Sequence, residues 1–326
     1  MSIGGYNMPG FTTHYLFGAD AYKRISDRTV RQNLYKNPSA FGLGLQGPDV
    51  FFYSLPSYLL HRDNLGAIAH SQRTGLFFTN LLESRTMFTG HKRLLAIADA
   101  YLIGFLGHYT LDCTAHPYIY ALTRYTPANP PKEINYFGQH AYLETELDGT
   151  LLQLKKHKQP SRFHQNATIH LNALQKSVIA RMLTYAYRNT YPDLIIHEWM
   201  MYGAFFWMST GTRLIRDPYG QKKVLARFIE RIFIGHAFLS PMIPSDHHHF
   251  VADPMNLAHK TWTHPWTKEI SNSSFPDLYA QAGQLYDRRI RHYEKMINRG
   301  FTREDRRRFC HEYGNRSFLS GLSLVN

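Results

Sequence analysis

The chain has 326 residues, of which 44% are hydrophobic and 19% are charged, so it can bury a core and is not expected to be disordered. Its two cysteines, Cys113 and Cys310, allow one disulfide but exclude a disulfide-rich scaffold, a CxxC zinc site and an iron–sulfur site. The net charge of +13 favours anionic partners such as phosphate esters, nucleic acid or an anionic lipid surface, although a basic surface that is only solvated is the alternative.

The N-terminal sequence shows no basic start, apolar core and small-residue cleavage site, so we do not expect a signal peptide. The most apolar stretches, 96–107 and 194–208, are shorter than the roughly 20 residues that a membrane span needs. These features predict a cytoplasmic protein.

Helical periodicity dominates the chain, and no series of strands with period-two alternation is seen, so we predict an all-α, multi-helix fold. Glycine- and proline-rich sequences predict loops at 42–48 and 125–133, and 240–266 is predicted to be a long ordered loop rich in His and Trp. Pro117 is expected to stop or bend the long helix that contains it. Helices are expected at 19–33, 61–82, 91–122, 139–154, 169–187, 194–215, 222–238 and 276–298, the last being the final helix and 194–215 a buried one.

The predicted domain organisation is a helical domain over 1–239, followed by residues 240–326 as a loop and a C-terminal helix packed on the same domain. The internal triplet His247, His248 and His249 is interpreted as an exposed His run in that loop rather than as a metal site.

Five side chains of the kinds that bind metals follow a helical spacing. His108, Asp112 and His116 are spaced four and four, and His140 and Glu144 are also four apart. Residues four apart lie on the same face of a helix, so two helices would each present one set. Mixed imidazole and carboxylate ligands suit zinc, and an open position on such a zinc makes a hydrolytic site.

The alternative is a set of core polar groups that hydrogen-bond one another. His108 and Asp112 lie in an apolar segment, where burying them without partners would cost several kcal/mol. A metal ion would satisfy both of them and His116, so we favour the metal site. His14, Asp49 and His70 are weaker candidates upstream, and Asp49 follows a Gly–Pro turn that can present its carboxylate rigidly.

Taken together, these segments resemble the zinc-dependent phospholipase C family. The resemblance covers roughly residues 8–150, with the His and Asp positions in the order typical of that family. It rests on the segments MPGFTTHYLFG, FGLGLQGPDVFFY, LGAIAHSQRTGLFF, AYLIGFLGHYTLDCTAHPYIY and QHAYLETELD.

The resemblance implies an all-α fold with up to three zinc ions in a cleft, two of them expected with more weight than the third. It implies that a zinc-activated water attacks a phosphodiester and that Asp49 is the candidate catalytic base. The implied ligands are His70, His108, Asp112 and Asp49 for the first zinc, His116, His140 and Glu144 for the second, and His14 with a bridging Asp112 for the third.

Two other functions compete with a phospholipase C-like phosphodiesterase. One is a zinc-dependent nuclease for single strands, which the basic charge allows but for which no ladder of aromatic and basic residues is seen. The other is a protein that binds metal or lipid without catalysis. The expected partner is a phosphodiester such as a phospholipid head group, with peripheral contact to a membrane and with nucleic acid as the weaker alternative.

Overall fold

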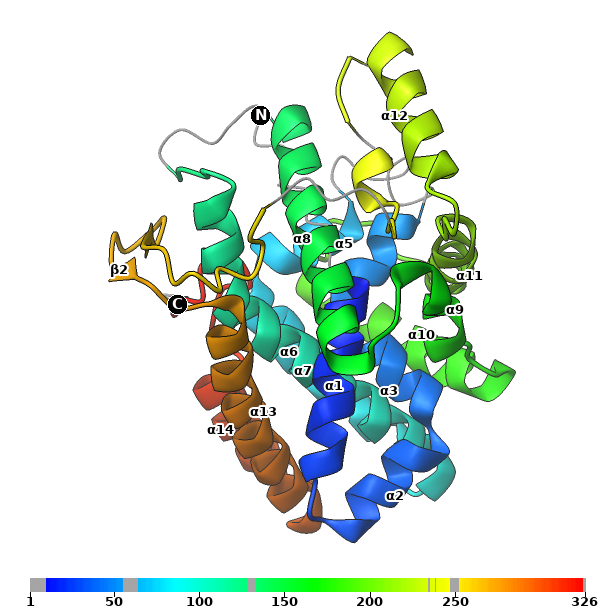
Figure 1. Cartoon of the computed structure of the whole chain (residues 1–326). Helices are drawn as coiled ribbons and strands as arrows, with labels where there is room; N and C mark the ends of the chain where they lie inside the picture. Colours follow the sequence, from blue (N-terminus) through cyan, green and yellow to red (C-terminus); the bar gives the residue numbers. More distant parts are fainter. Residues whose placement is uncertain are drawn as a thin grey trace.

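The computed structural model describes residues 10–54, 64–127, 133–233, 235–237, 239–246 and 252–324 and is built almost entirely of helices (Figure 1). The all-α prediction is therefore confirmed. The helices are α1 (Phe11–Arg24), α2 (Arg28–Lys36), α3 (Pro38–Gly44), α5 (Leu65–Ser71), α6 (Thr74–Glu83), α7 (Lys92–Leu122), α8 (Glu133–Lys156), α9 (Gln165–Thr168), α10 (Ala173–Thr190), α11 (Glu198–Leu214), α12 (Gln221–Phe233), α13 (Phe275–Asn298) and α14 (Arg303–Tyr313).

Short elements join these helices. The 3-10 turns are η1 (Gly47–Tyr53), η2 (Ser84–Phe88), η3 (Pro160–Arg162) and η4 (Ser240–Met242). A two-stranded antiparallel hairpin pairs β1 (Trp262–Thr263) with β2 (Ile270–Ser271), and β1 falls inside the segment 240–266 that was predicted to be a loop.

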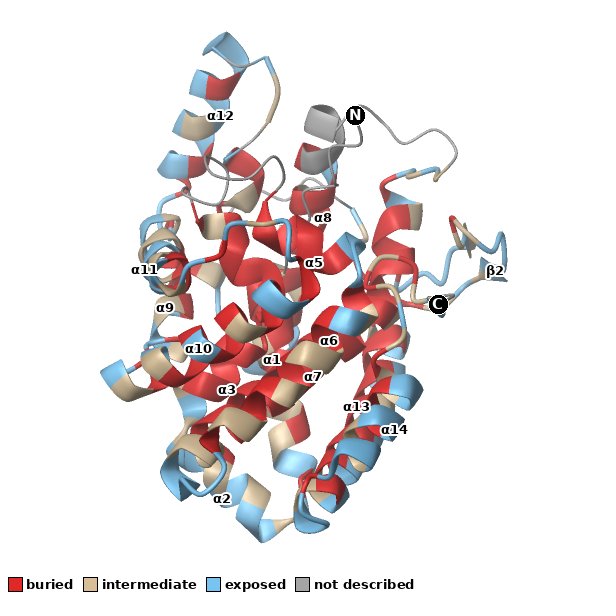
Figure 2. Cartoon of the chain, turned by 180° about the vertical axis from the view of Figure 1, so that it is seen from behind, coloured by how far each residue is buried: buried red, intermediate tan, exposed pale blue. Residues whose placement is uncertain are grey.

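Helix α7 forms the centre of the molecule, with α3 and α13 packed along it (Figure 2). By length and composition α7 could cross a membrane, but 83% of its most apolar window is buried inside the protein. Its apolar side chains are thus covered by the other helices, as expected for a core helix.

Pro117 was expected to stop or bend the helix predicted over 91–122, and the stop is wrong, because α7 continues to Leu122. Proline lacks the N–H that would bond to the carbonyl oxygen of Cys113, four residues earlier. Gly321 in the C-terminal tail lies against this carbonyl, since a Cβ built on Gly321 would be 2.2 Å from it. Its positive φ of 65° also favours glycine, so the tail packs tightly where the helix has lost a hydrogen bond.

Several predicted boundaries are also wrong. The helix expected over 19–33 is two helices, α1 and α2, and the Asp27 carboxylate caps the second one. The described part of the segment 61–82 is likewise divided into α5 and α6, and α14 follows the helix predicted to be the last. Cys113 and Cys310 are both free and buried, so they do not form the disulfide that their number allows.

Candidate metal centre

Five elements bring the eight predicted site residues together in the core. Helix α7 contributes three of them, α8 two, and α1, η1 and α5 one each. All are almost completely buried, with exposed fractions of 0 to 4%. They are His14 from α1, Asp49 from η1, His70 from α5, His108, Asp112 and His116 from α7, and His140 and Glu144 from α8.

The first group is formed by His70, His108 and Asp112. The Nε2 atoms of the two histidines are 3.3 Å apart. Asp112 Oδ2 lies 3.1 Å from His108 Nε2 and 3.5 Å from His70 Nε2. Two ligands of a tetrahedral zinc with bonds of about 2.0–2.1 Å are separated by about 3.3 Å. The three atoms therefore form a triangle of the size of one face of a zinc tetrahedron.

A backbone contact orients His70 for this role. Its Nδ1 lies 2.7 Å from the carbonyl oxygen of Gly66, one turn earlier in α5. Because a carbonyl oxygen can only accept, Nδ1 carries the proton and Nε2 offers its lone pair to the group. Such a contact fixes the tautomer of a metal-binding histidine.

The second group is formed by His116, His140 and Glu144. Glu144 Oε1 lies 3.1 Å from His140 Nε2 and 3.6 Å from His116 Nε2. His116 Nδ1 donates a hydrogen bond to the carbonyl oxygen of Phe318 at 2.9 Å, so Nε2 is the ring nitrogen that faces the group. The two α7 positions His108 and His116 thus serve different groups, with Asp112 between them.

His14 and Asp49 complete the cluster. His14 Nε2 lies 3.2 Å from Asp112 Oδ1, whereas His70 and His108 contact the other oxygen of that carboxylate, Oδ2. Asp49 Oδ1 lies 3.3 Å from His70 Nε2, and Asp49 Oδ2 lies 3.5 Å from His108 Nδ1. Ligand atoms of His14, Asp49 and His108 also approach one another within 4.8 Å, which gives a third group of three.

Gly47 allows η1 to approach α7. Its φ is 52°, in the left-handed region, and a Cβ at this position would be 2.2 Å from His108 Cδ2. A side chain here would push η1 and Asp49 away from the cluster. This agrees with the expectation that the Gly–Pro turn presents Asp49 rigidly.

Burial and mutual charge shift the pKa values of the cluster. Burial, together with the charges of Asp112 and Glu144, raises the pKa of Asp49 well above its usual range. Burial also acts to raise the pKa of Asp112, but His108, His116 and His14 together lower it well below the usual range. Against the effect of burial, Asp112 and Glu144 raise the pKa of His116 to about 9.

The cluster contains buried polar atoms that the protein leaves without hydrogen bonds. Within the described residues, His14 Nδ1, Asp49 Oδ2, His108 Nδ1 and Glu144 Oε2 have no hydrogen-bond partner. Burying carboxylate oxygens and imidazole nitrogens without hydrogen bonds is costly, and a divalent cation bound by such atoms offsets that cost. The donor set and the distances therefore fit zinc.

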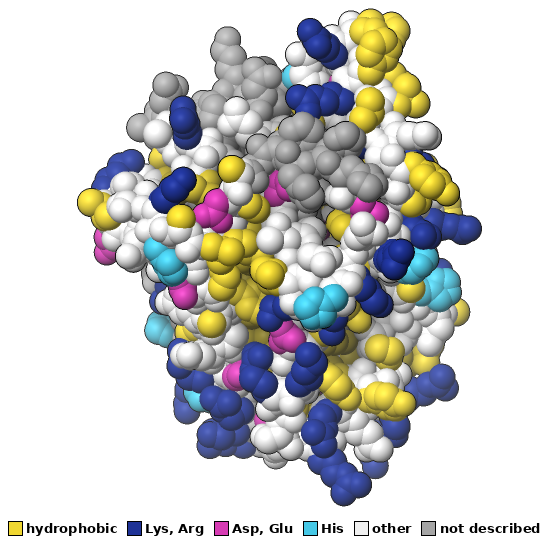
Figure 3. Space-filling model, in the orientation of Figure 1, with side chains coloured by type: hydrophobic (Ala, Val, Ile, Leu, Met, Phe, Trp, Pro, Cys, Tyr) yellow, Lys and Arg dark blue, Asp and Glu magenta, His cyan; other side chains and the backbone are white. Residues whose placement is uncertain are grey.

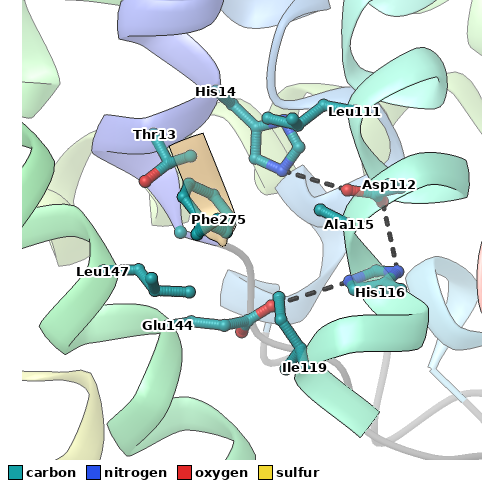
Figure 4. Close-up of a pocket in the computed structure, with 11 residues that line it drawn as sticks. Thr13, His14, Leu111, Asp112, Ala115, His116, Ile119, Glu144, Leu147 and Phe275 are labelled. Carbon is teal, nitrogen blue, oxygen red and sulfur yellow. Dashed lines mark ion pairs between the residues drawn. The ribbon is translucent and has the colours of Figure 1, made fainter. Parts of the chain in front are cut away.

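A pocket opens beside these groups (Figure 4). His14 and His116 point toward Asp112 from its two sides, and Glu144 approaches His116 from α8. Phe275, from the start of α13, and Leu147 form part of the apolar wall of this pocket. The pocket therefore lines these carboxylates and imidazoles with an apolar wall.

Comparison with known proteins gives one match. Residues 13–206 match the sequence profile of the family described as zinc dependent phospholipase C. The chain belongs to the zinc-dependent phospholipase C family. Comparisons with curated proteins and with solved structures find no significant match.

The family match extends the predicted resemblance. The sequence motifs covered roughly residues 8–150, whereas the match runs to residue 206 and so includes α10 and part of α11. All eight candidate ligands of this phospholipase C family member lie inside it. Helices α12, α13 and α14 lie outside it.

Two residues that contact the candidate ligands or the elements carrying them were not singled out from the sequence. Asp148 accepts hydrogen bonds from the backbone N–H groups of Thr12 and Thr13 at 2.9 and 2.7 Å, which fixes the start of α1 next to His14. Burial raises its pKa to about 6. Asp148 continues the four-residue spacing of His140 and Glu144, a signal that was available in the sequence.

The second is Phe318, which lies 202 positions after His116 in the sequence but contacts it in the fold. Its carbonyl oxygen orients His116, and its ring packs 4.7 Å from His70 and 5.8 Å from His108. No local pattern in the tail indicated this role. The triplet His247, His248 and His249 lies outside the described residues.

Proposed function

We propose that this chain is a zinc-dependent hydrolase that cleaves the phosphodiester of phospholipids and so releases their head groups. The observation that supports it most is the triangle of His70 Nε2, His108 Nε2 and Asp112 Oδ2, with edges of 3.3, 3.1 and 3.5 Å. Membership of the zinc-dependent phospholipase C family supports the reaction class.

We propose that His70, His108 and Asp112, with Asp49, hold one zinc ion, and that His116, His140 and Glu144 hold a second. His14 is proposed to hold a third together with Asp112. Zinc ions bound in this way supply positive charge that activates water near neutral pH and neutralises phosphate oxygens.

The surrounding residues hold the proposed ligands in their orientations before a substrate binds. Gly66 and Phe318 fix the tautomers of His70 and His116 through their carbonyl oxygens. Asp148 holds the first turn of α1, so that His14 points at Asp112 without reorganisation when a substrate binds. Such preorganisation lowers the barrier for a reaction in which negative charge develops on phosphate oxygens.

We propose Asp49 as the catalytic base. Its Oδ1 faces the first group, while Oδ2 accepts no hydrogen bond from the described residues. Oδ2 can therefore take the proton that the attacking water loses. Geometry supports this role, because a carboxylate oxygen that accepts no hydrogen bond and lies beside the proposed metal ligands is suited to receive a proton.

Turnover of a chromogenic phosphocholine diester, compared with single-stranded DNA, tests this function. We expect hydrolysis of the diester, loss of at least about a hundredfold in His108→Ala and Glu144→Ala, and no effect of His170→Ala, which replaces an exposed histidine outside the cluster. Cleavage of DNA alone would indicate a nuclease. Cleavage of neither by the zinc-loaded protein would indicate a binding protein and contradict the proposal.

A further inference from the structure

Exposed apolar side chains are concentrated in one short part of the chain. Of the 21 large apolar residues that stand exposed in the described structure, 14 lie between residues 195 and 239. Scattered single apolar residues are normal on a protein surface, but a contiguous group indicates a binding surface. Both helices of this part, α11 and α12, contribute to the group.

Helix α12 exposes its apolar residues and buries two charged ones, the reverse of an ordinary surface helix. Its six large apolar residues are all exposed, with Phe228 at 62% and Phe233 at 80%, and they lie three or four positions apart along one face. Its buried residues are instead the charged Lys223 and Glu230. An ordinary surface helix buries its apolar stripe. We call this face the α12 apolar face; it consists of Val224, Leu225, Phe228, Ile229, Ile232 and Phe233.

Specific contacts hold α12 in this orientation. The Glu230 carboxylate accepts hydrogen bonds from the backbone N–H of Leu239 and, at 2.8 Å, from that of Ser240. At the other end, the Asp217 carboxylate accepts from the backbone N–H of Lys223 at 2.9 Å. Lys222 Nζ donates to the last carbonyl oxygen of α11, that of Leu214, at 2.8 Å. These hydrogen bonds therefore hold α12 in the orientation that leaves its apolar face exposed.

Helix α11 extends the apolar surface. Trp199, Tyr202, Phe206 and Leu214 are exposed and spaced at three, four and eight residues, which places them on one side of the helix. The prediction that this helix is buried is wrong for this side. In Figures 1 and 2 α11 and α12 follow the same edge of the molecule, and Figure 3 shows hydrophobic side chains gathered on that edge.

The charges beside the apolar face are positive. Lys222, Arg227 and Arg231 are exposed on α12, while Glu230, the one acidic residue in its sequence, is buried. A helix with an apolar face and flanking basic residues lies in the interface of an anionic membrane. A second copy of the chain would bring like charges together, so charge complementarity favours lipid. We propose that α11 and α12 dock this protein on the surface of a bilayer that contains anionic phospholipids.

The docking surface is joined directly to the candidate metal centre. Gly211 of α11 packs on Tyr53 at the end of η1, the element that contributes Asp49. Pro241 of η4, which follows α12, accepts a hydrogen bond through its carbonyl oxygen from Thr145, the neighbour of Glu144 in α8, at 2.8 Å. This inference rests on the proposed function: docking on a bilayer brings the candidate metal centre close to its substrate because the phosphodiester to be cleaved lies in that bilayer.

Cosedimentation with vesicles tests the inference. We expect the native chain to bind vesicles of phosphatidylglycerol more strongly than vesicles of phosphatidylcholine. Phe228→Glu combined with Ile232→Glu is expected to weaken the binding by at least about tenfold, because two exposed apolar side chains that enter the lipid are replaced by anions. Ile270→Glu in β2, where Ile270 is 75% exposed, is the matched control and is expected to leave binding unchanged.

The inference fails if the native chain does not bind either vesicle, or if Ile270→Glu weakens binding as much as the double substitution. It also fails if sedimentation shows a dimer that the double substitution disperses, since a second copy would then cover the surface. Hydrolysis of a water-soluble phosphocholine diester should be equal in the native chain and the double variant. Vesicle binding without any such hydrolysis would contradict the proposed function and leave the docking surface standing.

Discussion

His116 Nδ1 lies 2.9 Å from the carbonyl oxygen of Phe318, a residue 202 positions later in the chain. The C-terminal tail therefore forms part of the wall behind the candidate metal centre. The Phe318 side chain is fully buried and packs on the rings of His70 and His108. Consequently, the site depends on a segment outside the part that matches the zinc-dependent phospholipase C family.

Phe318→Ala should lower both stability and metal retention. Removing a fully buried phenylalanine leaves a cavity and costs about 3–5 kcal/mol in the free energy of unfolding. Chemical denaturation measures this change, and elemental analysis after dialysis measures the zinc retained. Phe228→Ala, at an exposed position of α12, is the control and should change the unfolding free energy by less than about 0.5 kcal/mol. Equal effects of the two substitutions would contradict the role of Phe318.

Gly47→Ala should disturb the approach of η1 to α7. The substitution places a Cβ 2.2 Å from His108 and in a left-handed conformation, so we expect a loss of about 2–4 kcal/mol of unfolding free energy and weaker zinc retention. Gly90→Ala is the matched control, because its φ of 87° is also positive but no atom lies within 4 Å of the new Cβ. If both variants retain zinc equally, the contact with His108 does not position Asp49.

Asp99→Ala should destabilise the packing of α13 on α7. The Asp99 carboxylate accepts hydrogen bonds from Arg85 Nη2 at 3.0 Å and from the Tyr293 hydroxyl at 2.7 Å, and all three side chains are buried. Leaving the Arg85 charge unpaired costs about 3–5 kcal/mol. The double substitution Arg85→Met and Asp99→Met should cost less than Asp99→Ala alone when both are measured by denaturant unfolding. A larger cost for the double variant would contradict this explanation.

Glu294 should make stability depend on pH. Burial, with a further contribution from Asp27, raises its pKa from 4.5 to about 7 in the folded chain. Below the unfolded pKa the carboxyl is neutral in both states, so its contribution to stability is fully present there. As the pH rises through about 7, the folded chain must hold a charge in a half-buried place, and that contribution is lost.

The isosteric Glu294→Gln removes this titration. Relative to the variant, the unfolding free energy of the native chain should fall between about pH 4.5 and 7 and stay constant above that range. The total decrease should be about 1 kcal/mol or less, because solvent screens the partly exposed carboxyl. Denaturant unfolding of both proteins across this pH range measures the difference. A difference that does not change with pH would show that the Glu294 pKa is not raised.

The sequence predicted the parts of the site that follow a helical period. His108, Asp112 and His116 lie in α7, and His140 and Glu144 lie in α8, because a spacing of four keeps side chains on one face of a helix. The start of α7 was predicted to within one residue, and its end at Leu122 was predicted correctly. Whether Pro117 would stop the helix was left open, because the tail glycine that packs against the free carbonyl is 204 positions away in the sequence.

The rest depended on long-range packing. Nothing local in the tail indicated that Phe318 orients His116, and the periodicity of 194–215 could not show which side of α11 would be covered by the other helices. A helix was predicted over 222–238, but helical periodicity alone does not say whether the apolar face turns toward the protein or toward solvent. The division of the chain at residues 239 and 240 stays a prediction.

The zinc content of the purified chain tests the central claim most directly. Elemental analysis after dialysis should give two or more zinc ions per native chain and per His170→Ala chain, and fewer for His108→Ala and Glu144→Ala. Circular dichroism of each variant should show that the helices remain, so that a loss of metal is not a loss of fold. A native chain that is folded and binds no zinc when zinc is supplied would contradict the account.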